Sequence, residues 1–149
     1  MNRAFRLFAA FGLCAALAAC GRPATRTDYT VSVTFTPAAV AALKAANESV
    51  VLDAYYYGAP TDAMKSKANE AGQIELGQDL TAVDPASPTV HVAGKGILQN
   101  DLALTDGKID VELRAYSGTD RENLLKCAPV TAALADLQAR PATIACDAA

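Results

Sequence analysis

Hydrophobic and polar residues alternate with a period of two in several short stretches of this chain. In residues 29–35, Tyr, Val, Val and Phe occupy every second position, with Thr and Ser between them. Side chains with this period point to opposite faces of a β-strand, so one face packs in a core and the other meets solvent. Comparable stretches predict further strands at residues 49–57, 73–80, 89–93, 98–104 (broken near Asn100), 108–116, 123–127 and 143–146.

Seven or eight short strands separated by turn residues are typical of a β-sandwich. We therefore expect one antiparallel sandwich over residues 29–149, interrupted by two short helices. Thr36 and Pro37 begin the first helix, which ends near Asn47. Helical spacing over residues 130–139 predicts the second. The polar residues 63–71 predict a loop or one loose helical turn.

The alternation also assigns side chains to faces of each predicted strand. In residues 73–80 it places Leu80 toward the core, on the same side of the strand as Ile74 and Leu76.

Asp53, Tyr55 and Tyr57 occupy alternate positions of one predicted strand and should share a face. Aromatic rings beside a carboxylate bind sugars, cations or protein partners, so these three residues form a candidate ligand or partner site. The alternative is that the tyrosines are simply good strand formers and that a loop or helix covers them.

The first 19 residues have the features of a signal peptide. Arg3 and Arg6 are followed by an uncharged run over residues 7–19. This run is shorter than the roughly 20 apolar residues that a membrane-spanning helix needs. We therefore expect residues 1–19 to direct export and then to be removed.

Leu17, Ala18, Ala19 and Cys20 end this run, and Gly21 follows. The tetrad resembles the lipobox of bacterial lipoproteins. The resemblance implies cleavage before Cys20, then acylation of its thiol and of the new amino terminus with palmitate-type chains that anchor the protein. The alternative is an ordinary secretory leader, with Cys20 present by chance.

Residue 21 and the residues that follow it refine the expected location of the protein in the cell envelope. In lipoproteins of this kind, an Asp after the modified Cys tends to retain the protein at the inner membrane. Here that residue is Gly21, which implies the inner leaflet of the outer membrane, facing the periplasm. Residues 20–28 lack apolar periodicity and form an acylated Cys with a short tether, ahead of the domain at 29–149.

The mature chain is mildly acidic. Without Arg3 and Arg6, 11 basic and 16 acidic residues remain, for a net charge of −5. Its basic residues form no run longer than the separated pair Lys65 and Lys67. A surface of this sign repels phosphate backbones, which argues against a nucleic-acid partner.

Processing leaves two cysteines in an oxidising compartment, because Cys14 leaves with the leader and Cys20 is acylated. We expect Cys127 and Cys146 to form a structural disulfide. Two unpaired buried thiols are the alternative. A zinc site would need more ligands than these thiols and the single histidine, His91, supply.

The sequence contains no motif that identifies an enzyme, a metal site or a cofactor. His91 alternates with valines in a predicted strand and should face solvent. Asp53, Glu75 and Asp79 could pair for acid–base chemistry only if the strand register brought them together. The aspartates in loops fit ordinary turn chemistry better than a calcium loop: they are Asp84, Asp101, Asp106 and Asp120.

These features predict a non-catalytic envelope lipoprotein that acts as a binding or assembly accessory, with another envelope protein as its partner. Its lipobox, size and sandwich-like pattern resemble the small outer-membrane lipoprotein of type VI secretion, although no motif of the mature domain takes part in this resemblance. The alternatives are a sandwich that binds a small sugar or cation and, less favoured, a hydrolase without a recognised motif.

Overall fold

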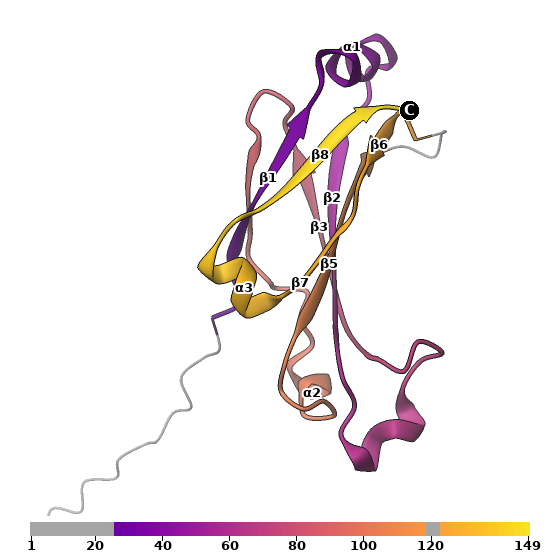
Figure 1. Ribbon diagram of the computed structural model, residues 1–149, viewed down its shortest axis with the longest axis vertical. Helices are drawn as coiled ribbons and strands as arrows, with labels where there is room; N and C mark the ends of the chain where they lie inside the picture. Colours follow the sequence, from indigo (N-terminus) through magenta and orange to yellow (C-terminus); the bar gives the residue numbers. More distant parts are fainter. Residues whose placement is uncertain (1–25, 119–122) are drawn as a thin grey trace, which may run out of the picture.

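The computed structural model describes residues 26–118 and 123–149. The expected signal peptide, the expected lipobox with Cys20, the expected tether as far as Thr25, and Asp120 all lie outside the described residues. The described chain folds as a β-sandwich of two four-stranded sheets (Figure 1). One sheet has the order β4-β1-β8-β6 and the other has the order β3-β2-β5-β7.

The strands largely follow the alternation of the sequence. Those of the first sheet are β4 (Thr89–Val92), β1 (Tyr29–Phe35), β8 (Ala142–Ala148) and β6 (Leu125–Cys127). Those of the second are β3 (Ile74–Val83), β2 (Val50–Gly58), β5 (Asp110–Ser117) and β7 (Val130–Ala133). Within β2, every second residue from Val50 to Gly58 is buried, and the residues between are half-buried.

The core lies between the two sheets and is mainly aliphatic. Its largest fully buried side chain, Tyr56, comes from β2. Valines, leucines and isoleucines of both inner faces fill most of the remaining space, as expected for two sheets packed face to face. The expectation of antiparallel pairing holds for every strand pair except β1 with β8, which run parallel. A parallel pair requires a crossover, and here the whole second sheet lies between these two strands in sequence.

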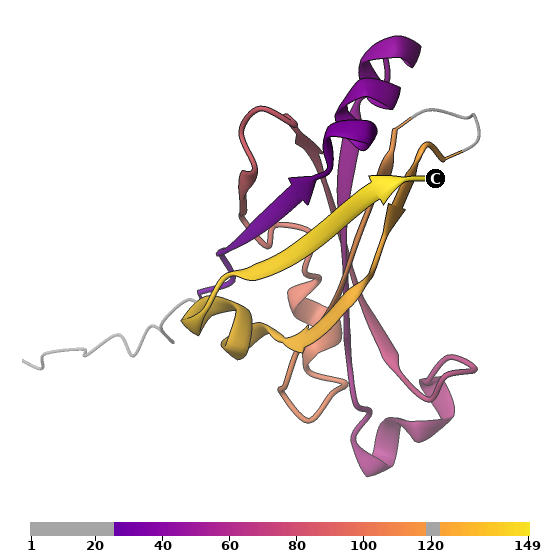
Figure 2. The same cartoon turned by 45° about the horizontal axis from the view of Figure 1, so that its top comes forward.

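Helical segments lie at the ends and edges of the sandwich. Helix α1 (Pro37–Ala46) has Thr36 as its N-cap and Pro37 in its first turn, as predicted. It lies at the same end of the molecule as the C-terminus (Figure 2). The 3₁₀ segment η1 (Asp62–Lys67) and the short helix α2 (Gln99–Leu102) lie toward the opposite end.

Two element predictions were wrong. Residues 98–104 contain helix α2 instead of a strand, because Leu98 and Leu102 are spaced for one helical turn and the Leu102 amide bonds to the Leu98 carbonyl. Residues 130–139 form β7 followed by helix α3 (Leu134–Ala139), instead of one helix. The β-branched pair Val130 and Thr131 begins this stretch and pairs with β5, so it extends the sheet.

The predicted cysteine bridge is present. Cys127 of β6 and Cys146 of β8 form a disulfide across directly opposite positions of the two strands. Cys146 is buried in the core, and Cys127 is half-buried against it. The bridge therefore ties the edge strand β6 to β8, which already pairs with β1 on its other side.

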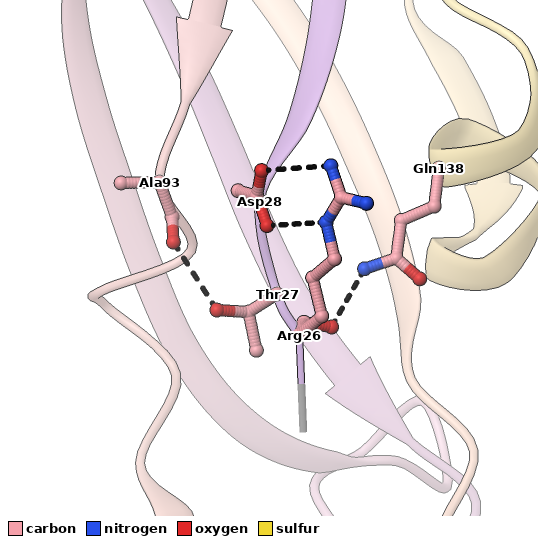
Figure 3. Close-up of polar contacts among 5 residues, drawn as sticks. All are labelled: Arg26, Thr27, Asp28, Ala93 and Gln138. Carbon is pink, nitrogen blue, oxygen red and sulfur yellow. Dashed lines mark hydrogen bonds and ion pairs between the residues drawn. The ribbon is translucent and has the colours of Figure 1, made fainter. Parts of the chain in front are cut away.

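The chain is fixed to the domain before its first strand begins. The Arg26 carbonyl accepts a hydrogen bond from Gln138 Nε2 of α3 at 2.6 Å (Figure 3). Thr27 Oγ1 donates to the Ala93 carbonyl at 3.1 Å, and Arg26 pairs with Asp28 through two nitrogen–oxygen contacts. Arg26 thus already contacts the sandwich, although it belongs to the stretch expected as tether. None of the described helices is long and apolar enough to cross a membrane.

Candidate functional site

The outer side of the β3-β2-β5-β7 sheet carries the residues that the sequence singled out. Pairing of β2 with β3 and β5 arranges twelve outward-facing residues in four rows. We call this surface the tyrosine face. From the α1 end, its rows are Ala82, Val51, Tyr116; Leu80, Asp53, Arg114; Gln78, Tyr55, Glu112; and Glu75, Tyr57, Asp110.

Asp53, Tyr55 and Tyr57 share this face, as the alternation predicts. The ring centroids of Tyr55 and Tyr57 lie 5.9 Å apart, with 30° between the ring planes. Both tyrosines are half-buried. Their neighbours along β3 and β5 supply part of the cover, and Asn69, in the loop before β3, lies beside the Tyr55 hydroxyl. The rings therefore form part of the accessible surface.

Leu80 is on this face because of a β-bulge, which corrects the expectation that it packs in the core. The register of β3 shifts opposite Tyr56 and Tyr57, where Gly77 has a φ of 112°. The extra residue reverses the alternation for the rest of the strand. Leu80 consequently points outward, opposite Asp53, and is 60% exposed.

Gly77 is required for this bulge on two grounds. Its positive φ is strained for any residue with a Cβ atom. A Cβ atom would also overlap the carbonyl oxygen of Gly96, in the segment that follows β4 and crosses the edge of β3. The shift explains why the period-two pattern of β3 gave the wrong face for Leu80.

The same shift turns Asp79 inward, opposite Ala54. There its carboxylate accepts a hydrogen bond from the Tyr56 hydroxyl at 2.9 Å and one from the Gly96 amide at 2.9 Å. Because Tyr56 donates its one hydroxyl proton to Asp79, Tyr29 donates to Tyr56, at 3.1 Å. The chain of three groups connects β1 of one sheet with β2 and β3 of the other.

Burial and charge alter the titration of these groups. Burial raises the pKa of Tyr29 to about 12 and raises the pKa of Tyr56 as well. On the tyrosine face, partial burial raises the pKa of Asp53, while the positive charge of Arg114 opposes this effect. Asp53 Oδ1 is shielded from solvent and has no hydrogen-bond partner among the described residues.

The carboxylates considered for acid–base chemistry do not form a pair. Asp53 is opposite Leu80 on β3, whereas Glu75 is opposite Tyr57, two rows away. Asp79 lies on the other side of the sheet, where it serves the hydrogen-bond network with Tyr56. Strand register could not be deduced from the sequence, and the bulge in β3 added a second unknown.

His91 and two of the loop aspartates adopt the positions expected of them. His91 is exposed on β4. Asp84 and Asp106 each accept a hydrogen bond from the backbone amide two residues later, which is ordinary turn chemistry. Asp101, which was expected in a loop, lies instead in the first turn of helix α2. Within residues 26–118 and 123–149, no group of three or more His, Cys, Asp or Glu side chains could hold a metal ion.

Two open grooves lie away from the centre of the tyrosine face. One, of about 430 Å³, is between the end of α1 and the turn from β3 to β4, and includes Leu43 and Pro85. The other, of about 410 Å³, is lined by Arg26, Lys108, Asp110 and residues of α3. It places the point where the chain enters the domain next to Asp110, in the last row of the tyrosine face.

The two outer surfaces of the sandwich differ strongly. The outward residues of the β4-β1-β8-β6 sheet form what we call the threonine face, which has mainly small polar side chains and neither tyrosine nor phenylalanine. They are Thr30, Ser32, Thr34, Thr89, His91, Lys126, Thr143, Ala145 and Asp147. Three of the five tyrosines of the protein are on the tyrosine face.

Comparison with protein families, curated proteins and solved structures finds no match to this chain.

Proposed function

We propose that the protein is a lipoprotein anchored through acyl chains on Cys20 and facing the periplasm, and that it binds another envelope protein through the tyrosine face. It acts as a non-catalytic binding or assembly accessory. The lipobox and Gly21 support a position in the inner leaflet of the outer membrane.

The observation that carries the proposal is the contrast between the two outer faces. Tyr55, Tyr57 and Leu80 expose aromatic and aliphatic surface on one sheet, while the other sheet presents small polar groups. Tyrosine is enriched in protein interfaces because its ring offers a large contact area at a small cost in conformational entropy, and its hydroxyl can form a hydrogen bond. A solvated sheet without a partner does not need this composition.

The point at which the chain enters the folded domain agrees with a partner close to the membrane. Arg26, which contacts the domain, lies six positions after Cys20. A chain of this length reaches at most about 21 Å. Because Arg26 and Asp110 line the same groove, an anchor at Cys20 would keep the last row of the tyrosine face near the lipid surface.

The binding function can be tested by photo-crosslinking in intact cells. A benzoylphenylalanine at position 55 of the full chain should form an adduct with a defined envelope protein. The matched control carries the same group at position 91, which is exposed on the threonine face. Identical adducts from both positions, or none from position 55, would argue against the tyrosine face as a binding surface.

The anchor is tested separately with Cys20→Ser. A serine hydroxyl does not replace the acylated thiol, so the variant should take up no labelled palmitate and should accumulate as an uncut precursor. A native protein that is cut, unlabelled and soluble would show that an ordinary signal peptidase processes it.

The second candidate function is binding of a small sugar or cation, and the neighbouring rings of Tyr55 and Tyr57 are the observation that favours it. Such a ligand should raise the melting temperature of the native protein, and should not do so when both tyrosines are alanine.

A further inference from the structure

The tyrosine face is acidic at one end. Its twelve residues include four carboxylates and one guanidinium, Arg114. The Arg114 Nε lies 3.2 Å from Glu112 Oε1, so this one positive charge is already engaged. Within the described residues, Glu75 and Asp110 take part in no ion pair. They flank Tyr57 on its two sides.

The nearby carboxylates act on the two tyrosine hydroxyls as well, after the larger effect of burial. Burial raises the pKa of Tyr55, and the charge of Glu75 raises it further. Burial also raises the pKa of Tyr57, with added effects of Asp110 and then Glu112. Because Glu75 and Asp110 lie on the two sides of Tyr57, their negative charges favour a cation over the rings.

The other end of the face is apolar. Leu80 lies there beside the row formed by Ala82, Val51 and Tyr116. The surface therefore changes from aliphatic to acidic and aromatic along β2. Side chains on one face of a strand repeat about every 6.8 Å, so an extended segment of another chain has the pitch to place alternate side chains over successive rows.

We propose that the tyrosine face binds an extended, basic segment of the partner protein, with two Arg or Lys side chains over Tyr55 and Tyr57 and an apolar side chain over Leu80. This inference rests on the proposed function and adds the chemistry of the partner. Guanidinium groups suit the site because they stack on aromatic rings and form planar contacts with carboxylates such as Glu75 and Asp110.

The test measures binding of a labelled peptide to the full-length protein in mild detergent. The peptide is acetyl-Leu-Thr-Arg-Thr-Arg-amide, whose Leu and two Arg side chains repeat at the pitch of the rows. A control peptide carries citrulline, a neutral analogue of arginine, at both basic positions. Fluorescence anisotropy should show binding of the arginine peptide that weakens with added salt, and little binding of the citrulline peptide.

Charge variants locate the site. Glu75→Gln with Asp110→Asn removes two carboxylates but leaves both tyrosines in place, and should weaken binding roughly fivefold. The matched control is Asp84→Asn with Asp136→Asn, which makes the same change of charge at exposed positions outside the tyrosine face. This control should bind the peptide like the native protein.

The outcomes separate the inference from the proposed function. Equal binding of both peptides, or equal weakening by both charge variants, would overturn the basic-segment inference. If the crosslink from position 55 also persists in the Glu75→Gln, Asp110→Asn variant, the inference fails while the proposed function stands. If the otherwise native protein forms no crosslink from position 55, or forms the same crosslinks from positions 55 and 91, both the inference and the proposed function fail. A melting-temperature increase with a sugar or a metal ion in place of the peptide would favour the small-ligand alternative.

Discussion

Tyr55, Tyr56 and Tyr57 are consecutive in β2, yet they belong to different parts of the protein. Tyr56 points between the sheets, is fully buried, and donates a hydrogen bond to Asp79. Tyr55 and Tyr57 point outward and are half-buried between side chains of β3 and β5. The pleat of the strand, and not the type of residue, therefore separates a tyrosine that holds the fold from two that are available for binding.

The sharpest test of the inner side is Tyr56→Ala. We expect a loss of about 3–5 kcal/mol in the free energy of unfolding, because the change leaves a large cavity and removes a buried hydrogen-bond network. Urea unfolding measures this loss. Tyr56→Phe is the matched control, since it keeps the ring and should lose only about 1–2 kcal/mol. A loss below about 1 kcal/mol for Tyr56→Ala would contradict its central place in the core.

The disulfide is a second feature of the inner side of the sandwich. Replacing both Cys127 and Cys146 with serine should lower the free energy of unfolding by roughly 3 kcal/mol, because the bridge closes a loop between residues 19 positions apart. Calorimetry of the double variant and of the reduced native protein should agree. Two free thiols in protein alkylated during isolation from the envelope would show that the bridge does not form in the cell.

The bulge in β3 sets the boundary between the two faces, and Gly77→Ala tests it. We expect a loss of about 1–3 kcal/mol, since the new Cβ adds backbone strain at positive φ and overlaps Gly96. Gly107→Ala is the control: Gly107 also has a positive φ, but no atom lies within 4 Å of the place that its Cβ would occupy. Equal losses for the two variants in chemical unfolding would mean that close packing against Gly96 adds nothing.

The smallest expected effect concerns Asp53. Its pKa is raised in the native state, chiefly by burial, so ionisation above the ordinary value of 3.8 disfavours the native state. Asp53→Asn should therefore stabilise the protein slightly at pH 7, and this gain should vanish below about pH 3.8. Melting temperatures measured across this range test the sign.

Asp147→Asn should change the stability of the protein at pH 7 in the opposite direction. Hydrogen bonds from Thr36 and from the Ala148 amide hold the pKa of Asp147 below its ordinary value. Its ionised form therefore stabilises the native state at pH 7, and that contribution is lost as the pH falls through the native pKa. A gain for Asp147→Asn at pH 7, or a loss for Asp53→Asn, would contradict this assignment of the two carboxyls.

The sequence predicted the sandwich because alternation over residues 29–35, 49–57 and 108–116 is strict, and the strands β1, β2 and β5 follow it. It also predicted the shared face of Asp53, Tyr55 and Tyr57. It failed for Leu80 because a bulge depends on contacts between β3 and the distant Gly96, which no local pattern records.

The sequence also could not predict which residues of the neighbouring strands surround the two outer tyrosines. Glu75, Asp110, Glu112 and Arg114 surround them only through the register of β2 with β3 and β5. Strand register arises from tertiary packing, so the acidic character of the face emerges only in the folded protein. The glycine at position 77 was the one signal in the sequence for a bulge in β3.

We propose that the outer tyrosines of β2 serve binding and that the inner one serves the fold, and one double variant tests this division. The most direct measurement examines Tyr55→Ala with Tyr57→Ala for both its unfolding free energy and its crosslink to the envelope partner, with the crosslinking group placed at position 80. We predict that it unfolds cooperatively, loses less than about 2 kcal/mol, and loses the crosslink. A double variant that is as unstable as Tyr56→Ala, or that keeps the crosslink at the native level, would contradict the account.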